Sequence, residues 1–305
     1  MVTTTENTLF GFMRAVIEWL EMAGKRRSAD AYRAALSSYR QFRQGRDIKL
    51  GDITGDEMVR YQAHMANRGI CPNTTSFYMR ILRATYNRAV DGGIVAQRHP
   101  FSHVYTGIAR TVKRAIPVAD IVRLRCLDLG DKPHLALARD IFLFSFYMRG
   151  MAFVDMAHLR KRDYANGIIT YRRRKTGHPL SIKVEDCARR IIDRYADPAS
   201  PYLLPLIKNP GDAYRQYRNA LHRTNVALHR LGALTGIHIS LTTYVGRHSW
   251  SSAANASNIP LSIISESLGH NSQSTTQIYL ASLDAALLDA ANAQILRQLE
   301  PPPET

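Results

Sequence analysis

The spacing of apolar residues predicts that the first hundred positions form a bundle of helices. In 10–20 the apolar side chains recur at intervals of three and four, which places them on one helical face. The stretches 28–42, 54–67 and 73–90 show similar spacing, and Ser28 and Thr54 stand where N-caps are expected. Glu57 follows Thr54 by three residues, the spacing of a capping box.

The second part of the chain mixes helical patterns with one β pattern. The apolar run at 141–148 is too short to span a bilayer and predicts that 134–148 is a buried helix. Two β-prone runs in 167–184 flank Lys175-Thr176-Gly177, which predicts a hairpin with its turn at these residues. Further helices are predicted at 119–127, 185–196, 211–231, 244–257, 260–267 and 283–299.

A stretch without sustained periodicity separates the two patterns. Residues 91–117 contain glycines, prolines and basic residues, so we place an interdomain linker at 106–116. The linker divides a helical domain at 1–105 from a second domain at 117–300. The predicted fold class is therefore mainly α (α+β): a helical bundle followed by a mixed, mostly helical domain with a small β-sheet.

The charge adds a class of partner to this picture. The chain carries 41 Lys and Arg against 25 Asp and Glu, a formal net charge of +16. Residues 1–110 contribute +7 and the remainder +9, so the excess is not confined to a tail. A polyanion contacted along the whole molecule fits this distribution, and nucleic acid is the commonest one. The alternative is a basic protein with no polyanionic partner.

Cysteine usage and the N-terminus favour a cytoplasmic protein. The three cysteines lie far apart and form no CxxC pair, which excludes a disulfide scaffold and a zinc ribbon. The first residues lack the basic and apolar regions of a signal peptide, and no segment is long enough to cross a membrane.

Five polar residues in order along the second domain suit chemistry on a phosphodiester. They are Arg149, Lys175, Arg247, His270 and Tyr279. Two guanidiniums clamp the oxygens of a phosphate and stay charged at every accessible pH. A tyrosine hydroxyl is a nucleophile when it is held next to its target, and a lysine on a hairpin tip suits protonation of a leaving oxygen.

The same residues stand in motifs that resemble the tyrosine recombinase (phage integrase) family. The segment from RHSW through LGH to TTQIY, 247–279, is similar to the family's pattern in residue types and spacing. The resemblance covers nearly the whole chain, and 1–105 resembles the family's SAM-like core-binding domain. The segment RGMAFVDMAHL is similar to the branch found in Bacteroides-type mobile elements.

The resemblance implies a site-specific recombinase or integrase that cleaves and rejoins duplex DNA through a 3′-phosphotyrosine, without metal, ATP or any other cofactor. Tyr279 would be the nucleophile, Arg149 and Arg247 the phosphate clamp, Lys175 the acid and His270 a hydrogen-bond donor to the phosphate. The implied partners are double-stranded DNA with recombination sites, three further copies of the chain in a tetramer on DNA, and accessory DNA-bending proteins. The implied location is the cytoplasm, at the nucleoid.

Two positions depart from the family pattern. Tyr244 stands where the family usually has a histidine, so its hydroxyl is expected to position the phosphate at most, with a packed core tyrosine as the alternative. The first arginine is displaced: the family's glycine register would place Ala152 at that position and Asp155 at the acidic one. Arg149 lies three residues earlier, and on a helix it would share a face with Ala152.

Several basic clusters are candidates for contacts with DNA phosphates, with a solvated surface as the alternative. They lie in the linker, at the start of a predicted helix and before the hairpin turn: Arg110, Lys113, Arg114; Lys25, Arg26, Arg27; Arg172, Arg173, Arg174.

Two other functions fit parts of this pattern. A type IB topoisomerase-like enzyme would relax DNA with the same chemistry, and a non-catalytic DNA-binding regulator would use the same basic surface. The apolar stripe of 283–299 is expected to dock either on a neighbouring protomer or on its own domain.

Overall fold

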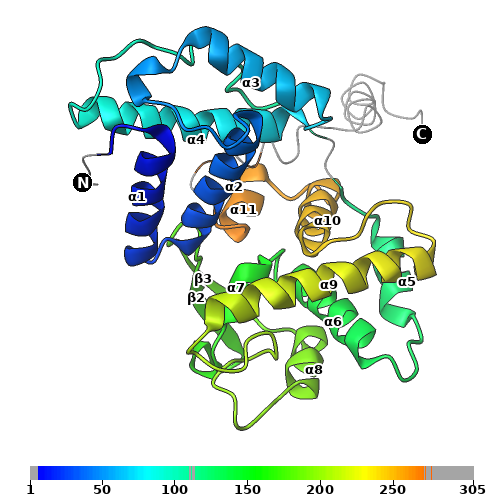
Figure 1. Ribbon diagram of the computed structural model, residues 1–305. Coiled ribbons are helices and arrows are strands. Elements are labelled where there is room, and N and C mark those ends of the chain that lie inside the picture. Colours follow the sequence, from blue (N-terminus) through cyan, green and yellow to red (C-terminus); the bar gives the residue numbers. More distant parts are fainter. Residues whose placement is uncertain (1–5, 110, 112–113, 271, 273–275, 277–305) are drawn as a thin grey trace, which may run out of the picture. The chain divides into compact units, whose positions relative to one another are not determined.

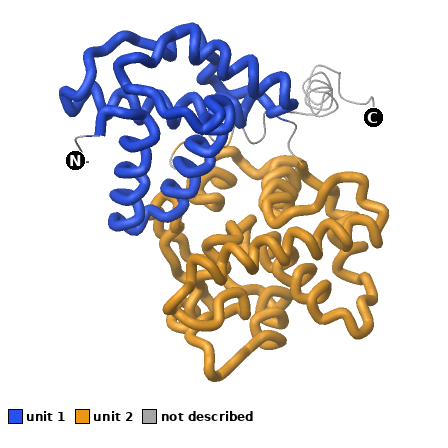
Figure 2. The backbone as a smooth tube through the Cα atoms, in the orientation of Figure 1, with its two compact units in different colours: residues 1–111 blue, residues 112–305 orange. Residues whose placement is uncertain are grey.

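The structure is a computed structural model that describes residues 6–109, 111, 114–270, 272 and 276. The chain divides into two compact units, 1–111 and 112–305 (Figure 2). The described part of unit 1 is helical, and that of unit 2 is mostly helical with a three-stranded sheet (Figure 1). The mainly α fold with a small sheet is thus as predicted.

Unit 1 is a helical bundle around an aromatic core. Tyr39 and Tyr61 are fully buried with their ring centroids 5.0 Å apart, and the Tyr39 hydroxyl donates to Glu57 over 2.6 Å. Arg43 pairs with the same carboxylate at 2.9 Å, so the buried charge is compensated. The elements are α1 (Leu9–Met22), α2 (Arg26–Phe42), the 3₁₀ turn η1 (Leu50–Asp52), α3 (Gly55–Asn67) and α4 (Pro72–Asp91).

The two predicted N-caps have different outcomes. The Thr54 side chain accepts from the Glu57 N–H at 3.3 Å, which confirms the cap of α3. Ser28 is not a cap, because α2 already begins at Arg26 with Lys25 before it. Basic residues therefore open this helix, an arrangement that the serine pattern alone did not predict.

Unit 2 is built around one buried helix, α6 (Pro133–Tyr147), which packs against four others. The predicted buried helix is confirmed, since Ile141, Phe142 and Phe144 are fully buried. Its neighbours are α5 (Val118–Cys126), α8 (Asp186–Arg194), α9 (Ala213–Thr235) and α10 (Thr243–Ala256). The remaining helical elements are α7 (Phe153–His158), η2 (Lys161–Asp163) and α11 (Leu261–Ser267).

The sheet has the strand order β1-β2-β3 and is antiparallel throughout. Its strands are β1 (Tyr164–Ala165), β2 (Ile168–Arg172) and β3 (Pro179–Lys183). The register pairs Tyr171 with Leu180 and Arg172 with Pro179, so β2 and β3 form the predicted hairpin. The intervening turn contains Lys175, as predicted.

The short helix α7 and the turn before it were not predicted. Helix α6 ends at Tyr147, Met148 is its C-cap, and Arg149 and Gly150 both adopt positive φ angles, of 55° and 69°. The chain is therefore not helical between Arg149 and Ala152, which is the N-cap of α7. The expectation that these two residues share a helical face is wrong. Within the described ranges no helix is long and apolar enough to cross a membrane.

Candidate active site

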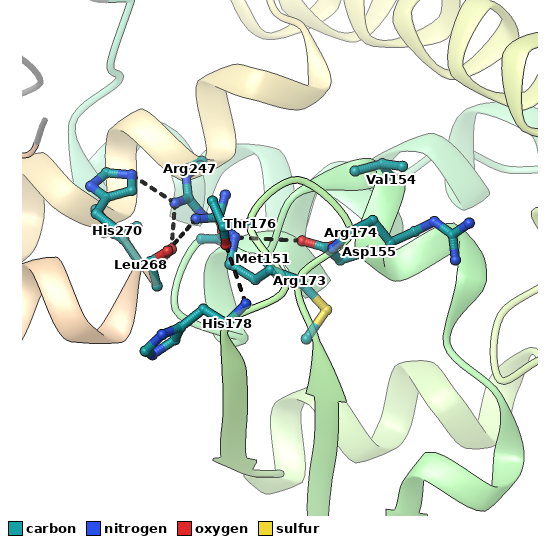
Figure 3. Close-up of polar contacts among 12 residues, drawn as sticks. Met151, Val154, Asp155, Arg173, Arg174, Thr176, His178, Arg247, Leu268 and His270 are labelled. Carbon is teal, nitrogen blue, oxygen red and sulfur yellow. Dashed lines mark hydrogen bonds and ion pairs between the residues drawn. The ribbon is translucent and has the colours of Figure 1, made fainter. Parts of the chain in front are cut away.

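Arg247 is the buried centre of the site. It lies on α10, is 4% exposed, and directs its guanidinium at two backbone carbonyls (Figure 3). One terminal nitrogen donates to the Gly150 carbonyl at 2.7 Å, and the other donates to the Leu268 carbonyl at 2.7 Å. The turn after α6 and the end of α11 are thereby held to one cation.

Gly150 is required for this approach. Its φ of +69° favours glycine, and a Cβ there would lie 3.1 Å from the Arg247 Cα. Because Gly150 has no side chain, the backbone of α10 at Arg247 packs closely against the turn that follows α6.

His270 is delivered to Arg247 by the C-terminus of α11. The Gly269 N–H donates to the Glu266 carbonyl and the His270 N–H donates to the Ser265 carbonyl. These bonds end the helix, with Gly269 at a φ of +61°. The His270 Nε2 lies 3.1 Å from an Arg247 Nη2, and its Nδ1 lies 2.8 Å from the Thr276 hydroxyl. Burial, followed by the charges of Arg247, Arg173 and Lys175, lowers the pKa of His270 to about 4. The imidazole is therefore neutral near pH 7.

Lys175 stands at the tip of the β2–β3 hairpin. Arg173 donates its N–H to the His178 carbonyl, and Gly177 donates to the Arg173 carbonyl at 2.7 Å, which fixes the turn. The Lys175 side chain is exposed, and its charge contributes to the lowered pKa of His270. A solvent-accessible ammonium thus lies within electrostatic reach of buried Arg247 and partly buried His270.

Arg173 is a further buried cation of the site. It is 6% exposed, its Nη1 donates to the Gly269 carbonyl at 2.6 Å, and its Nε lies 3.8 Å from an Asp155 oxygen. Asp155 also accepts from the Arg174 backbone N–H at 2.9 Å (Figure 3). Burial lowers the pKa of Arg173, and the neighbouring charge of Arg247 lowers it further.

These contacts correct the interpretation of Arg173 as part of a DNA-facing basic run. Its guanidinium points inward to Asp155 and Gly269, whereas Arg172 and Arg174 beside it are exposed. The RRR run itself contains no signal that distinguishes Arg173 from its two neighbours. The β alternation supplies one afterwards, because Arg173 follows the strand in register with buried Ile169.

Arg149 is exposed and lies beside the site rather than in its buried centre. It lines an open pocket of about 390 Å³ together with His178 and Leu180 of the hairpin and Ile263 and Glu266 of α11. Its neighbour Gly150 is bonded to Arg247, so the backbone of Arg149 adjoins the proposed phosphate clamp.

Tyr244 is 52% exposed on α10, and its ring packs edge-on against His248 with centroids 4.7 Å apart. This exposure rules out the alternative of a core tyrosine. His248 is buried at 7% exposure, which is typical of a structural histidine.

The predicted DNA-contacting residues divide by location. Lys25, Arg26 and Arg27 are exposed at the start of α2, and Arg114 is exposed at the start of unit 2. Lys25 also lies over the Trp19 ring, 5.5 Å from its centroid. Tyr279, Arg110, Lys113 and the predicted helix 283–299 lie outside the described residues.

The described residues contain no group of three or more His, Cys, Asp or Glu side chains that could hold a metal ion. The polar side chains around Arg247 are the cations Arg173 and Lys175, the neutral His270 imidazole and the Asp155 carboxylate, while Glu266 lines the adjoining pocket. Such a set binds and orients an anion.

Two family profiles match the chain in order. The phage integrase SAM-like domain matches residues 8–104, and the phage integrase family matches residues 146–286. The tyrosine recombinase XerD of Rhizobium meliloti is 26% identical over 296 residues, which cover 89% of this chain and 91% of the relative. The tyrosine recombinase XerA of Thermococcus kodakarensis is 24% identical over 238 residues, covering 75% of this chain and 78% of the relative.

Two solved structures share the fold. A lambda integrase dimer bound to a COC′ core site aligns with a TM-score of 0.67 at 15% identity, over 89% of this chain and 77% of that one. The Tn1549 transposon integrase in complex with transposon right end DNA aligns with a TM-score of 0.67 at 13% identity, over 96% of this chain and 100% of that one. From these matches and the placement of Arg247 and His270, the chain belongs to the phage integrase family of tyrosine recombinases.

Proposed function

We propose that this protein is a site-specific recombinase that cleaves and rejoins duplex DNA with Tyr279 as its nucleophile. One observation carries the proposal: Arg247, held by two backbone carbonyls, meets His270 within electrostatic reach of Lys175. These residues come from α10, the end of α11 and the hairpin, and all lie in the part that the phage integrase profile matches.

The scissile phosphate binds at Arg247. The guanidinium has more N–H donors than the three contacts to Gly150, Leu268 and His270 use, and the remaining donors bind the phosphate. Arg149 supplies the second guanidinium from the edge of the site. Tyr244 is exposed on the same helix as Arg247 and contributes a hydroxyl to the phosphate.

The Tyr279 oxygen attacks the phosphorus and loses its proton to water, while the bond from phosphorus to the 5′ oxygen breaks. The product is a 3′-phosphotyrosine and a free 5′ end. Lys175 gives a proton to the departing 5′ oxygen, which suits an exposed ammonium on a turn. His270 donates a hydrogen bond to a non-bridging oxygen, where negative charge develops in the transition state.

Rejoining is the same reaction in reverse, with the 5′ hydroxyl of another strand as the attacking group. The phosphotyrosine retains the phosphodiester bond energy, so the reaction needs neither ATP nor a metal. Four protomers on two duplexes exchange strands in pairs, and a solved lambda integrase structure is a tetramer bound to a Holliday junction. The apolar stripe predicted at 283–299 has two candidate docking surfaces, a neighbouring protomer and its own domain, and accessory DNA-bending proteins assist assembly.

The rest of the chain binds the duplex. A core-binding domain at 1–105 and a catalytic domain at 117–300 are joined by the linker 106–116, and each contacts the DNA. The exposed cations contact phosphates: Lys25, Arg26, Arg27, Arg110, Lys113, Arg114, Arg172 and Arg174. The likeness of the RGMAFVDMAHL segment supports the proposal that the enzyme is of the Bacteroides-type mobile-element branch, acting in the cytoplasm at the nucleoid.

A library of nicked duplexes with randomised sequence tests this function. A nick close to the cleavage point lets the short 5′ fragment diffuse away, which traps the covalent adduct. The wild-type protein is incubated with the library, adducts are isolated in SDS, and their DNA is sequenced. We expect one pair of inverted sequence elements to be enriched, and we expect two plasmids carrying those elements to recombine.

The alternatives give different results in the same experiment. Adducts without sequence enrichment, together with relaxed plasmid and no recombinant, would indicate a topoisomerase-like enzyme. DNA binding without any adduct would indicate a regulator.

A further inference from the structure

The imidazole of His270 lies between two polar partners of different chemistry. Its Nε2 faces the Arg247 guanidinium at 3.1 Å, and its Nδ1 faces the Thr276 hydroxyl at 2.8 Å (Figure 3 shows the contact with Arg247). Thr276 is fully buried, and His270 is partly buried. In the sequence Thr276 precedes Tyr279 by three residues.

The donor rules determine where the imidazole proton lies in this arrangement. A guanidinium has only N–H donors, so the nitrogen that faces Arg247 must accept. A neutral imidazole carries one N–H, and with Nε2 accepting, that N–H is on Nδ1. The Nδ1–H then donates to the Thr276 oxygen. The lowered pKa of His270, about 4, keeps the ring in this neutral form near pH 7.

This proton position is opposite to the one that the proposed function requires. To donate to a phosphate oxygen at the position of the Arg247 contact, His270 needs its proton on Nε2. Nδ1 then has a lone pair and requires a donor. A threonine hydroxyl meets both needs, because it accepts from an N–H in one state and donates to a lone pair in the other.

We propose that Thr276 is a positioning residue that lets His270 change tautomer when the scissile phosphate binds. In the free protein Nε2 accepts from Arg247 and Nδ1–H donates to Thr276. When the phosphate binds, Nδ1 releases its proton to water and Nε2 takes one up from water, so the ring stays neutral. Arg247 and the Nε2–H of His270 then both donate to the phosphate, and the Thr276 hydroxyl rotates to donate to Nδ1. The inference rests on the proposed function for its bound state only.

The free state is tested without DNA. With ¹⁵N-labelled histidine, two- and three-bond proton–nitrogen spectra distinguish the two tautomers, and loss of a signal in His270→Gln assigns it. We expect the Nδ1–H form in the wild type and in Thr276→Ser. A wild-type protein with the proton on Nε2 would overturn the proposal, whether or not the protein cleaves DNA.

The bound state is tested by the rate of adduct formation at saturating nicked duplex, with the sequence that the library selects. Thr276→Val keeps the shape of the side chain and removes the hydroxyl, and Thr276→Ser keeps the hydroxyl and removes the methyl. We expect Thr276→Val to lose about 10²-fold in cleavage rate with DNA affinity unchanged, as for loss of one oriented donor to a developing oxyanion. We expect Thr276→Ser to retain most of the wild-type rate.

Thr235→Val is the matched control, because the Thr235 hydroxyl donates to carbonyls of its own helix, those of Leu231 and Gly232. It should cleave like the wild type. Wild-type cleavage by Thr276→Val would overturn the proposal, and so would a Thr276→Ser enzyme as slow as Thr276→Val, which would indicate packing by the methyl group. If the wild type forms no adduct, the proposed function fails, and the spectra still decide the free state.

Discussion

Replacing Arg173 by Met should destabilise unit 2 far more than replacing its neighbour Arg172. Arg173 is 6% exposed and spans from Asp155 to the Gly269 carbonyl, whereas Arg172 is exposed. Removing the guanidinium loses a charged hydrogen bond, about 1.5–3 kcal/mol, and leaves the Gly269 carbonyl without that donor. It also leaves the Asp155 carboxylate, which is 3% exposed, without its nearest cation.

Together these losses correspond to about 3–5 kcal/mol, the usual cost of removing one partner of a buried ion pair. Burial already raises the pKa of Asp155, so the variant partly relieves the cost by protonating this carboxyl. For a unit of this size, about 2–4 °C per kcal/mol, the melting temperature should fall by about 6–20 °C.

The assay is thermal unfolding of the full chain at pH 7, with Arg172→Met as the control that should shift stability by about 0.5 kcal/mol or less. A cycle with Asp155→Asn and the double variant measures the coupling between the two side chains. We expect about 1–3 kcal/mol of coupling, typical of groups in one network. Equal melting temperatures for the Arg172 and Arg173 variants, or an additive cycle, would refute the assignment of Arg173 to the interior.

Three further predictions concern the same site. Gly269→Ala should lose both stability and cleavage, because the φ of Gly269 is +61° and the new Cβ would lie 2.6 Å from the Arg173 Cδ. The control is Gly236→Ala, where φ is +68° and no non-neighbouring atom of the described residues lies within 4 Å of the new Cβ, so thermal unfolding should show only the backbone cost of about 1–2 kcal/mol. Arg149→Ala should abolish adduct formation while DNA affinity in a binding assay stays nearly unchanged. Arg149→Lys should recover little activity, because an ammonium lacks the planar fork of a guanidinium. Near-normal cleavage by Arg149→Ala would show that another residue supplies the second cation at the phosphate. The pKa of His270 is about 4 in the folded protein against an ordinary value of 6.5, so the unfolded chain takes up the proton first, and the contribution of His270 to stability is complete above pH 6.5 and is lost as the pH falls toward 4. In urea titrations the unfolding free energy of the wild type should therefore fall with pH more steeply than that of His270→Asn over this range. Equal pH dependence in the two proteins would contradict this prediction.

Local signals predicted the elements of the site well. The apolar run of α6, the hairpin with Lys175 in its turn and the helix that carries Arg247 each depend on residues close together in the sequence. Periodicity and turn chemistry describe such segments because their main determinants are local.

The contacts that assemble the site were not predictable in the same way. Arg173 and Gly269 are separated by 96 residues, and Arg247 and Gly150 by 97, so no periodic pattern relates them. In both contacts the acceptor is a backbone carbonyl, which every residue has. The residue types therefore do not indicate which carbonyl is the partner. The two glycines were the available signal, since each has a positive φ and closely approaches an arginine side chain.

Arg149 shows how a local assumption can fail. Its three-residue offset from Ala152 would place both on one face of a helix, but α6 ends at Tyr147 and the chain turns through Gly150 instead. The turn allows the Gly150 carbonyl to reach Arg247. The contact with Arg247, 97 residues away, thus accompanies the end of α6 at Tyr147, where a local pattern would have continued the helix.

The location of the covalent bond to DNA tests the central claim most directly. Trypsin should release residues 248–297 as one peptide, and the only tyrosine in that peptide is Tyr279. Adduct trapped on the selected nicked duplex is digested with nuclease and trypsin, and the peptides are analysed by mass spectrometry. We predict that the nucleotide remnant lies on peptide 248–297 at Tyr279, and that Tyr279→Phe binds the duplex but forms no adduct. A remnant on any other peptide, or an SDS-resistant adduct with Tyr279→Phe, would contradict the account.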